Sequence, residues 1–182
     1  MGDVIMLHTE VFSKHYRVRP LTSADAENVL EVEKGNPQYY SYCPPAPTVQ
    51  GFMDDLIALP PQKTMEDKYF FGYFERLNHE SIDGDLVAII DLITSFPNPQ
   101  TAFIGFFMMN EKYQGRGEGS KIIQELLEKL LETGLEYVRL GYMKENEQSR
   151  AFWEKNGFIP TGVETDNGQG IVVVMQKELR KN

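Results

Sequence analysis

Three glycines at alternate positions, Gly115, Gly117 and Gly119, form the part of this sequence best suited to binding an anion. Glycine lets successive backbone N–H groups turn toward one point, because no Cβ stands in the way. An amphipathic helix expected directly afterwards, over Ser120 to Thr133, adds unpaired N–H groups and the positive end of its dipole. This arrangement suits a pyrophosphate, although a tight strand-to-helix turn without a ligand explains the glycines equally well.

Two common nucleotide-binding motifs do not fit this loop. A P-loop ends in Gly-Lys-Ser or Gly-Lys-Thr, and a dinucleotide-binding fold has the spacing G-x-G-x-x-G. The loop here is Gln114-Gly-Arg-Gly-Glu-Gly-Ser120, and it follows several expected strands instead of the first one. A P-loop and a Rossmann site are therefore disfavoured, while a different phosphate ligand stays an open alternative.

The loop and a second motif downstream resemble the GNAT superfamily of N-acetyltransferases. The family signature of Gln or Arg, two residues, Gly, one residue, then Gly or Ala is met by Gln114 to Gly119. The second motif is Asn146-Glu-Gln-Ser-Arg-Ala-Phe-Trp-Glu-Lys-Asn-Gly-Phe158. The resemblance is specific from about Leu86 to Leu179, and it covers Tyr16 to Leu59 only in the order of elements.

The resemblance implies a coenzyme A site between Phe103 and Phe158, with acetyl-CoA as the acyl donor and no metal. The strand before the loop would splay from the next strand, and pantetheine would pair with the opened edge. Asn146 would bond the pantetheine arm, although asparagine also suits a helix N-cap. The implied cofactor-binding residues are Phe107, Met109, Gln114, Gly115, Arg116, Gly117, Gly119, Ser120, Asn146 and Trp153.

Two residues depart from the family pattern. Glu118 places an acid between the glycines, so its carboxylate must face away from bound phosphates. Trp153 stands where many members carry a tyrosine that protonates the departing thiolate, and an indole N–H is no useful acid. Either the thiolate leaves unprotonated, or water or a residue such as Tyr142 serves as the acid. Ordinary core packing is the alternative role for Trp153.

Acetyl transfer to an amine would need three catalytic groups, for which we name Met109, Tyr142 and Asp91. The backbone N–H of Met109 is the candidate oxyanion donor, and Tyr142 is the candidate acid. Asp91 interrupts an apolar strand, and an acid that faces a cleft there should have a raised pKa, as a base requires. Alternatively, Asp91 points to solvent or pairs with a basic group.

Hydrophobic periodicity predicts the elements that must position these groups. The stretch from Pro37 to Thr48 is rich in proline and tyrosine and is expected to be an ordered loop. The order β-α-α-β-β-β-α-β-α-β indicates an α/β fold. The resemblance implies a GNAT-like mixed, mostly antiparallel central sheet flanked by helices, with splayed strands that form the acyl-CoA slot. Strands are expected over Tyr16–Leu21, Tyr69–Phe74, Leu86–Ile93, Thr101–Met109, Leu135–Met143 and Ile171–Gln176, and helices over Asp25–Glu33, Thr48–Leu59, Ser120–Thr133 and Glu147–Asn156.

The length of 182 residues favours a single acetyltransferase domain over 1–182. Within it we expect an N-terminal tail or edge segment at 1–15, acceptor-side helices and a loop at 16–65, and the sheet with the CoA-binding core at 68–179. The resemblance implies that the acceptor, an amine, lies over a group of aromatic and proline residues, although these side chains alternatively fill the core of a loop. The group consists of Tyr39, Tyr40, Tyr42, Pro44 and Pro45.

The charge and hydropathy of the chain exclude several classes of partner. Its 18 basic and 27 acidic side chains give a net charge of −9, with no basic stripe for nucleic acid. The apolar runs are too short to cross a membrane, and the N-terminus lacks the pattern of a signal peptide, which favours the cytoplasm. The acidic surface either attracts a cationic acceptor or serves solubility alone.

These observations predict an N-acetyltransferase that moves an acetyl group from acetyl-CoA to a primary amine of a small molecule or protein. The transfer would be direct, in a ternary complex. The alternative function is a catalytically weak CoA-binding regulatory module, suggested by Trp153 and the uncertain base. A homodimer is an open alternative to a monomer.

Overall fold

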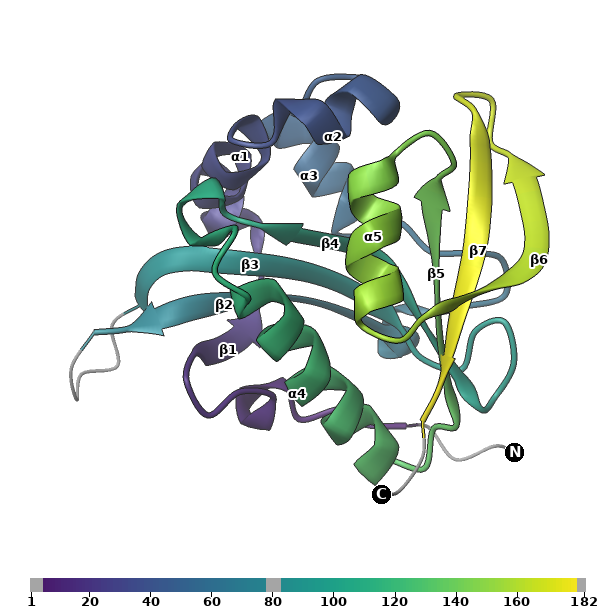
Figure 1. Cartoon of the computed structure of the whole chain (residues 1–182). Coiled ribbons are helices and arrows are strands. Elements are labelled where there is room, and N and C mark those ends of the chain that lie inside the picture. The colour runs from purple at the N-terminus through teal and green to yellow at the C-terminus, as the bar shows by residue number, and fades with distance from the viewer. Residues whose placement is uncertain (1–4, 78–82, 180–182) are drawn as a thin grey trace.

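A single mixed sheet of seven strands organises the chain, in the order β1-β2-β3-β4-β5-β7-β6 (Figure 1). The computed structural model describes residues 5–77 and 83–179. Every neighbouring pair is antiparallel except β4 and β5, which run parallel. The strands are β1 Arg17–Pro20, β2 Lys68–Arg76, β3 Asp83–Ile93, β4 Thr101–Met109, β5 Tyr137–Met143, β6 Ile159–Asp166 and β7 Ile171–Glu178.

Five α-helices cover the sheet on its two faces. The longest is α4, which leads out of the glycine loop, and α5 lies beside β5 in Figure 1. Three shorter helices cover the opposite face. The bounds are α1 Ala26–Lys34, α2 Pro37–Tyr42, α3 Val49–Asp55, α4 Glu118–Glu132 and α5 Glu147–Lys155, with 3-10 turns at Thr9–Val11, Ser23–Asp25, Met65–Asp67 and Glu111–Tyr113.

The two faces of the sheet form two separate hydrophobic cores. The larger core lies under α4 and α5 and includes the fully buried Ile90, Ile123 and Leu126. The smaller core lies under α1 and α3 and is built around Val29 and Ile89. Consecutive strand residues contribute to opposite cores, because side chains alternate across a strand. A residue's place in a strand therefore decides which side of the sheet it serves.

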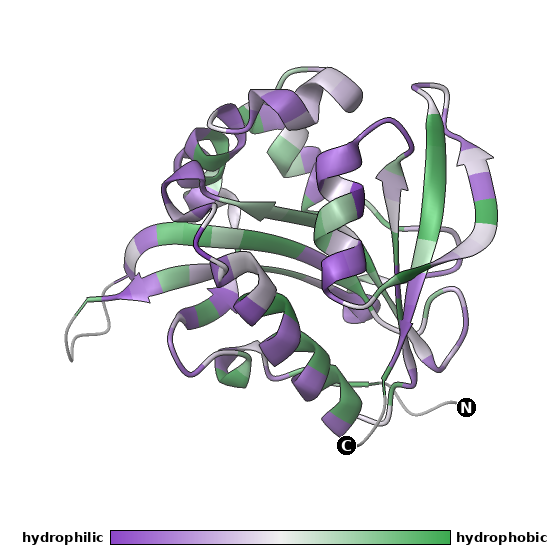
Figure 2. Cartoon of the chain, in the orientation of Figure 1, coloured by the Kyte–Doolittle hydropathy of each residue, from purple (hydrophilic) through white to green (hydrophobic). Residues whose placement is uncertain are grey.

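Helix α4 forms because its apolar residues recur at helical spacing. Five of them, Ile122, Ile123, Leu126, Leu127 and Leu130, are buried against the sheet. Figure 2 shows this hydrophobic stripe turned inward and the polar residues turned outward. Fully burying one such side chain contributes about 1.5–3 kcal/mol, so the helix is held firmly behind the glycine loop.

The N-terminal segment also contributes to the larger core. Leu7 and Phe12 are buried there, and the ring of Phe12 lies edge-on to Phe71 with centroids 5.5 Å apart. The Leu7 N–H donates to the Tyr69 hydroxyl at 3.1 Å. These contacts fix residues 5–12 against β2.

The structure corrects the sequence-based elements in three places. The expected loop at Pro37 to Thr48 begins with helix α2, because Pro37 occupies a first-turn position where its fixed φ suits a helix. Helix α3 ends at Asp55, earlier than the expected Leu59. Strand β6 was not predicted, because it is an edge strand whose residues are almost all exposed and show no alternation of burial.

The predicted fold class is confirmed: a mixed α/β fold with a mostly antiparallel, open sheet flanked by helices. Each of the remaining predicted strands and helices is present, with ends shifted by a few residues. Among the residues described, none of the helices combines the length and apolar character needed to cross a membrane.

Candidate functional site

Strands β4 and β5 part in the middle of the sheet. Their parallel pairing runs only from Thr101 opposite Tyr137 to Ile104 opposite Leu140. At that point β4 has a bulge at Gly105, because Ile104 and Phe106 face consecutive residues of β3. A bulge bends its strand and increases the local twist. The second half of β4 therefore leaves β5 and exposes one edge.

The exposed edge presents the backbone groups of Phe107 and Met109. The Asn110 N–H donates to the Val87 carbonyl at 2.9 Å, so the peptide after Met109 has its N–H on the β3 side. Backbone groups alternate along a strand, so the N–H and C=O of Met109, and those of Phe107, point away from β3. The Phe107 groups and the Met109 N–H have the direction that the predicted pairing with a pantetheine arm needs, whereas the Met109 carbonyl already accepts from Asn36 and Gln114.

The glycine loop takes a conformation that other residues resist. Gly115 and Gly117 have φ of +73° and +81°, and Gly117 is the N-cap of α4. Gly119 has a different reason to lack a side chain, because a Cβ there would lie 3.2 Å from the Met109 Cγ and 3.3 Å from the Phe152 ring. The first two glycines shape the loop, and the third lets α4 approach the strand.

The start of α4 supplies unpaired N–H donors next to this loop. Helices leave their first N–H groups without intrahelical partners, and here these belong to the turn that contains Glu118 to Ser120. The Ser120 hydroxyl accepts a bond from the Asn156 amide at 3.2 Å. Arg116 is exposed at the tip of the loop. These groups fit the predicted pyrophosphate site, and their contacts with a cofactor remain a prediction.

The Glu118 carboxylate is held by two neighbours. It accepts from the Tyr16 hydroxyl at 2.8 Å and from the Lys121 ammonium at 2.6 Å. The Lys121 and Tyr16 bonds keep the pKa of Glu118 below its usual value, and burial together with the Glu118 bond raises the pKa of Tyr16 to about 12. Tyr16 and Lys121 thus hold the Glu118 carboxylate through hydrogen bonds. Such partners are needed because a carboxylate directed at bound phosphates would repel them.

Asn146 caps helix α5. Its side-chain oxygen accepts from the Ser149 N–H at 3.0 Å. This bond fixes the side chain through Oδ1, so the Nδ2 group is the part suited to the predicted contact with pantetheine.

Trp153 belongs to an aromatic cluster in the larger core. Its side chain is only 6% exposed. Its ring lies 4.9 Å from that of Phe152, 5.2 Å from Phe158 and 5.7 Å from Phe107, by centroid distance. The packing role accounts for this residue, whereas its predicted cofactor contact has no feature in the structure to support it. Through Phe107, the cluster supports the opened half of β4.

Asp91 is paired with a buried lysine. Both carboxylate oxygens accept from the Lys68 ammonium, at 2.8 Å and 2.7 Å. The Lys68 side chain is 1% exposed and the Asp91 side chain 17%. Burial raises the pKa of Asp91, and Lys68 acts in the opposite direction. Asp91 therefore pairs with a basic group, as one of the two alternatives to the base role expected. Its role as the base stays a prediction, and in that role Asp91 would act together with Lys68.

Tyr142 lies on β5 beyond the point where the two strands part, opposite Val173 of β7. Burial raises the pKa of its hydroxyl. The phenol therefore stays protonated at neutral pH, and its role as the acid stays a prediction. Cys43, the one cysteine in the chain, is half-buried and burial raises its thiol pKa.

Two acceptor-side residues were missed by the sequence analysis. Glu33 is 5% exposed and is hydrogen-bonded to Tyr40, and burial raises its pKa to about 7. It follows Ala26 and Val29 at helical spacing, so an acid at a core position of α1 was the available signal. Lys68 lacked such a signal, because its partner is 23 positions away.

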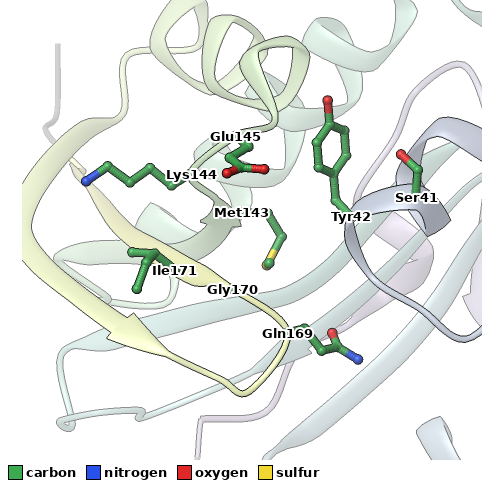
Figure 3. A pocket seen from close by; sticks show the side chains of 8 residues that line it. All are labelled: Ser41, Tyr42, Met143, Lys144, Glu145, Gln169, Gly170 and Ile171. Carbon is green, nitrogen blue, oxygen red and sulfur yellow. The ribbon is translucent and has the colours of Figure 1, made fainter.

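A small cavity lies between α2 and the far ends of β5 and β7. It has a volume of about 180 Å³. Figure 3 shows Tyr42 and Ser41 on one side, and Met143, Glu145 and Gln169 on the other. The Gln169 amide also donates to the Pro44 carbonyl at 2.5 Å, which ties the β6–β7 turn to the segment after α2. Lys144, Gly170 and Ile171 complete the lining.

Metal chemistry has no obvious centre in the described part of the chain. Within residues 5–77 and 83–179, no group of three or more His, Cys, Asp or Glu side chains is arranged to hold an ion.

Comparisons with known proteins agree with this geometry. The sequence profile described as "Acetyltransferase (GNAT) family" matches residues 43–158, more than half of the chain. The match includes the splayed strand, the glycine loop and the Asn146 motif.

Solved structures share the fold along most of this chain. An acetyltransferase from Thermus thermophilus superposes with a TM-score of 0.70 at 20% identity, and 91% of this chain and 97% of that one are covered. The ribosomal-protein-S18-alanine N-acetyltransferase from Escherichia coli gives 0.62 at 15% identity, covering 92% and 96%. The PaiA N-acetyltransferase from Thermoplasma acidophilum, solved in complex with coenzyme A, gives 0.62 at 19%, covering 90% and 98%.

Proposed function

The chain belongs to the GNAT acetyltransferase family, and from that premise we propose that it transfers the acetyl group of acetyl-CoA to a primary amine. The observation that carries the proposal is the opened edge of β4 at Phe107 and Met109, which leads directly into the glycine loop. The edge suits the amide-bearing pantetheine arm and the loop suits the pyrophosphate. The relative from Thermoplasma acidophilum, of the same fold, was solved with coenzyme A.

The acceptor would enter through the cavity between α2 and the β6–β7 turn. Met143, at the end of β5, is part of its lining, and β5 is one of the two strands that part. Glu145 supplies an acidic group at the cavity, and the chain as a whole carries a charge of −9. Both features favour an acceptor that arrives as a cation.

Direct transfer requires a bond from the amine nitrogen to the acetyl carbon, cleavage of the C–S bond and two proton movements. The nitrogen loses a proton, and the departing sulfur gains one. We assign oxyanion stabilisation to the Met109 N–H and proton donation to Tyr142. Asp91, with Lys68, is the proposed base. Cys43 is disfavoured as a covalent carrier, because its raised pKa keeps the thiol protonated.

Release of free thiol from acetyl-CoA tests this function directly. The protein would be incubated with acetyl-CoA and a panel of polyamines, aminoglycosides, amino acids and peptides. We expect thiol release with at least one cationic amine, above the rate without acceptor. The family match gives no support to a regulatory module without turnover. A silent panel, combined with intact acetyl-CoA binding, would nevertheless reject the enzyme and leave that module.

A further inference from the structure

The side chain of Asn36 joins the acceptor side of the molecule to the cofactor strand. It follows α1 directly and precedes Pro37, the first residue of α2. Its Nδ2 group donates to the Met109 carbonyl at 3.0 Å and to the Val32 carbonyl at 2.8 Å. Its Oδ1 accepts from the Gln114 amide at 2.7 Å. One side chain thus touches α1, the end of β4 and the first residue of the phosphate loop.

The orientation of this amide is fixed by its surroundings. Two of its three partners are carbonyl oxygens, which accept and cannot donate. A flipped amide would place its oxygen against both carbonyls and its nitrogen against the Gln114 NH₂ group. Only the orientation with Nδ2 toward Val32 and Met109 satisfies all of these contacts.

Gln114 completes a clamp on the Met109 carbonyl. Its Nε2 donates to that carbonyl at 3.0 Å as well as to Asn36. On the opposite side of the same peptide, the Asn110 N–H is bonded to Val87. The peptide after Met109 is therefore held from both sides and has little freedom to rotate.

The contact between α1 and the segment after β4 is close enough to make this clamp rigid. A Cβ at Gly35 would lie 3.2 Å from the Glu111 side chain, so glycine lets the end of α1 approach the 3-10 turn there. Lys112 in the same turn lies 3.7 Å from Glu31 of α1 and 3.2 Å from Asp85. The end of α1 and the exit from β4 form one packed unit.

From these contacts we infer that Asn36 is a positioning residue for the acetyl group, acting through the Met109 backbone. This inference rests on the proposed function, because it assigns the Met109 N–H to the thioester oxygen. The clamp holds the peptide after Met109, and the pairing of Met108 with Ile89 holds the peptide before it, so together they limit the directions open to the Met109 N–H. The side-chain amides of Asn36 and Gln114 also offset the partial negative charge of the Met109 carbonyl oxygen. The proposed function places the negative charge of the thioester oxygen beside this residue.

A comparison of two ligands isolates this role. Acetyl-CoA carries the thioester carbonyl and CoA does not, while both carry the same pantetheine and phosphates. We expect Asn36→Ala to weaken acetyl-CoA binding roughly two- to tenfold, the effect of losing the single hydrogen bond from the Met109 N–H to the thioester oxygen. The affinity for CoA should change by less than about twofold, because CoA has no thioester oxygen for the Met109 N–H and the substituted side chain is distant from the rest of the ligand. The Met109 carbonyl keeps its bond from Gln114, so the variant should fold.

Two further variants make the test decisive. Asn36→Asp keeps the size and the acceptor for Gln114 but turns an oxygen toward Met109, so it should lower the acetyl-CoA to CoA affinity ratio at least as much. Asn28→Ala, at an exposed position of the preceding helix α1, is the control and should leave the ratio unchanged. Calorimetric titration of each protein with both ligands gives the ratio, and a melting curve checks folding.

The outcomes separate this inference from the proposed function. A wild-type protein that binds neither ligand would reject the function and the clamp together. Wild-type binding of both ligands, with an unchanged affinity ratio in Asn36→Ala and Asn36→Asp, would reject the clamp alone. A selective loss of acetyl-CoA affinity in both variants would support the positioning role.

Discussion

The proposed cofactor side and the proposed acceptor side of this molecule are built from different kinds of groups. On the cofactor side, the proposed ligand meets mainly backbone N–H and C=O groups of β4, the glycine loop and the start of α4. On the acceptor side, residues from α2, the end of β5 and the β6–β7 turn come together around Tyr42 and Glu145. Backbone sites depend on conformation, whereas side-chain sites depend on which residues the fold brings together.

This difference explains where each side is sensitive to substitution. A backbone site fails when φ or a close approach is lost, as at Gly117. A side-chain site fails when one member of a pair is removed, as with Lys68 and Asp91. The predictions below test these two kinds of sensitivity.

The largest effect is expected from Gly117→Val. A branched residue at a φ of +81° is strained, and its side chain would block the approach of phosphate to the loop. We expect acetyl-CoA binding to fall below detection, by a factor of about 100 or more if the pyrophosphate contacts are lost. Calorimetric titration with acetyl-CoA would measure this loss.

Gly134→Val is the matched control for that substitution. Gly134 follows the opposite end of α4 with a φ of +88°, and a Cβ there would meet nothing within 4 Å. Both variants carry the same backbone strain, so their melting temperatures should fall by similar amounts. Equal acetyl-CoA affinity in the two variants would show that the loop does not hold the phosphates.

The second prediction concerns the buried ion pair on the acceptor side. Lys68→Met leaves the Asp91 carboxylate without its partner and should destabilise the protein by roughly 3 kcal/mol, the lower end for a broken buried pair. The double variant Lys68→Met/Asp91→Asn removes both charges and should recover most of that loss. Urea denaturation of the three proteins measures the free energy of unfolding.

The same pair decides the catalytic role of Asp91. If Asp91 is the base, Asp91→Asn should lower turnover more at low pH than at high pH, since more of the amine is already neutral at high pH. A uniform reduction across pH would contradict the base assignment and leave Asp91 as the structural partner of Lys68.

The smallest predicted effect is the pH dependence set by Glu33. Burial raises its pKa from the usual 4.5 to about 7, so the folded state holds this proton more tightly than the unfolded state does. The resulting stabilisation is present at low pH and is lost as pH rises through that window. Relative to Glu33→Gln, the wild-type protein should therefore lose stability between about pH 5 and about pH 8.

Urea denaturation at both pH values would measure this difference. Glu27→Gln, at an exposed position of the same helix, is the control and should follow the wild type. A parallel change of stability in the wild type and Glu33→Gln would show that Glu33 is not the titrating group.

The glycine loop and the helix after it could be predicted from sequence because their determinants are local. Gly117 and the apolar stripe of α4 lie within one continuous segment, so the loop and the helix were both expected where they are found. The splay of β4 from β5 was available only through family resemblance. Its physical cause, a bulge at Gly105, depends on the register with β3.

The contacts on the proposed acceptor side could not be predicted because the residues that meet there are distant in sequence. Asn36 meets Met109 across 73 positions, and Gln169 meets Pro44 across 125. Helix α2 was taken for a loop because its one proline and three tyrosines, followed by three more prolines, lack helical periodicity. The T-shaped contact of Tyr39 with Phe106, at 5.5 Å, supplies tertiary packing that local propensity does not reveal.

Binding of acetyl-CoA, followed by thermal melting, tests the central claim most directly. At about 100 times its Kd, a ligand that binds only the folded protein adds roughly 2.7 kcal/mol of stability and raises the melting temperature by several degrees. We predict that shift for the wild type and for Gly134→Val, and none for Gly117→Val. An unchanged melting temperature of the wild-type protein at millimolar acetyl-CoA would contradict the assignment of this site.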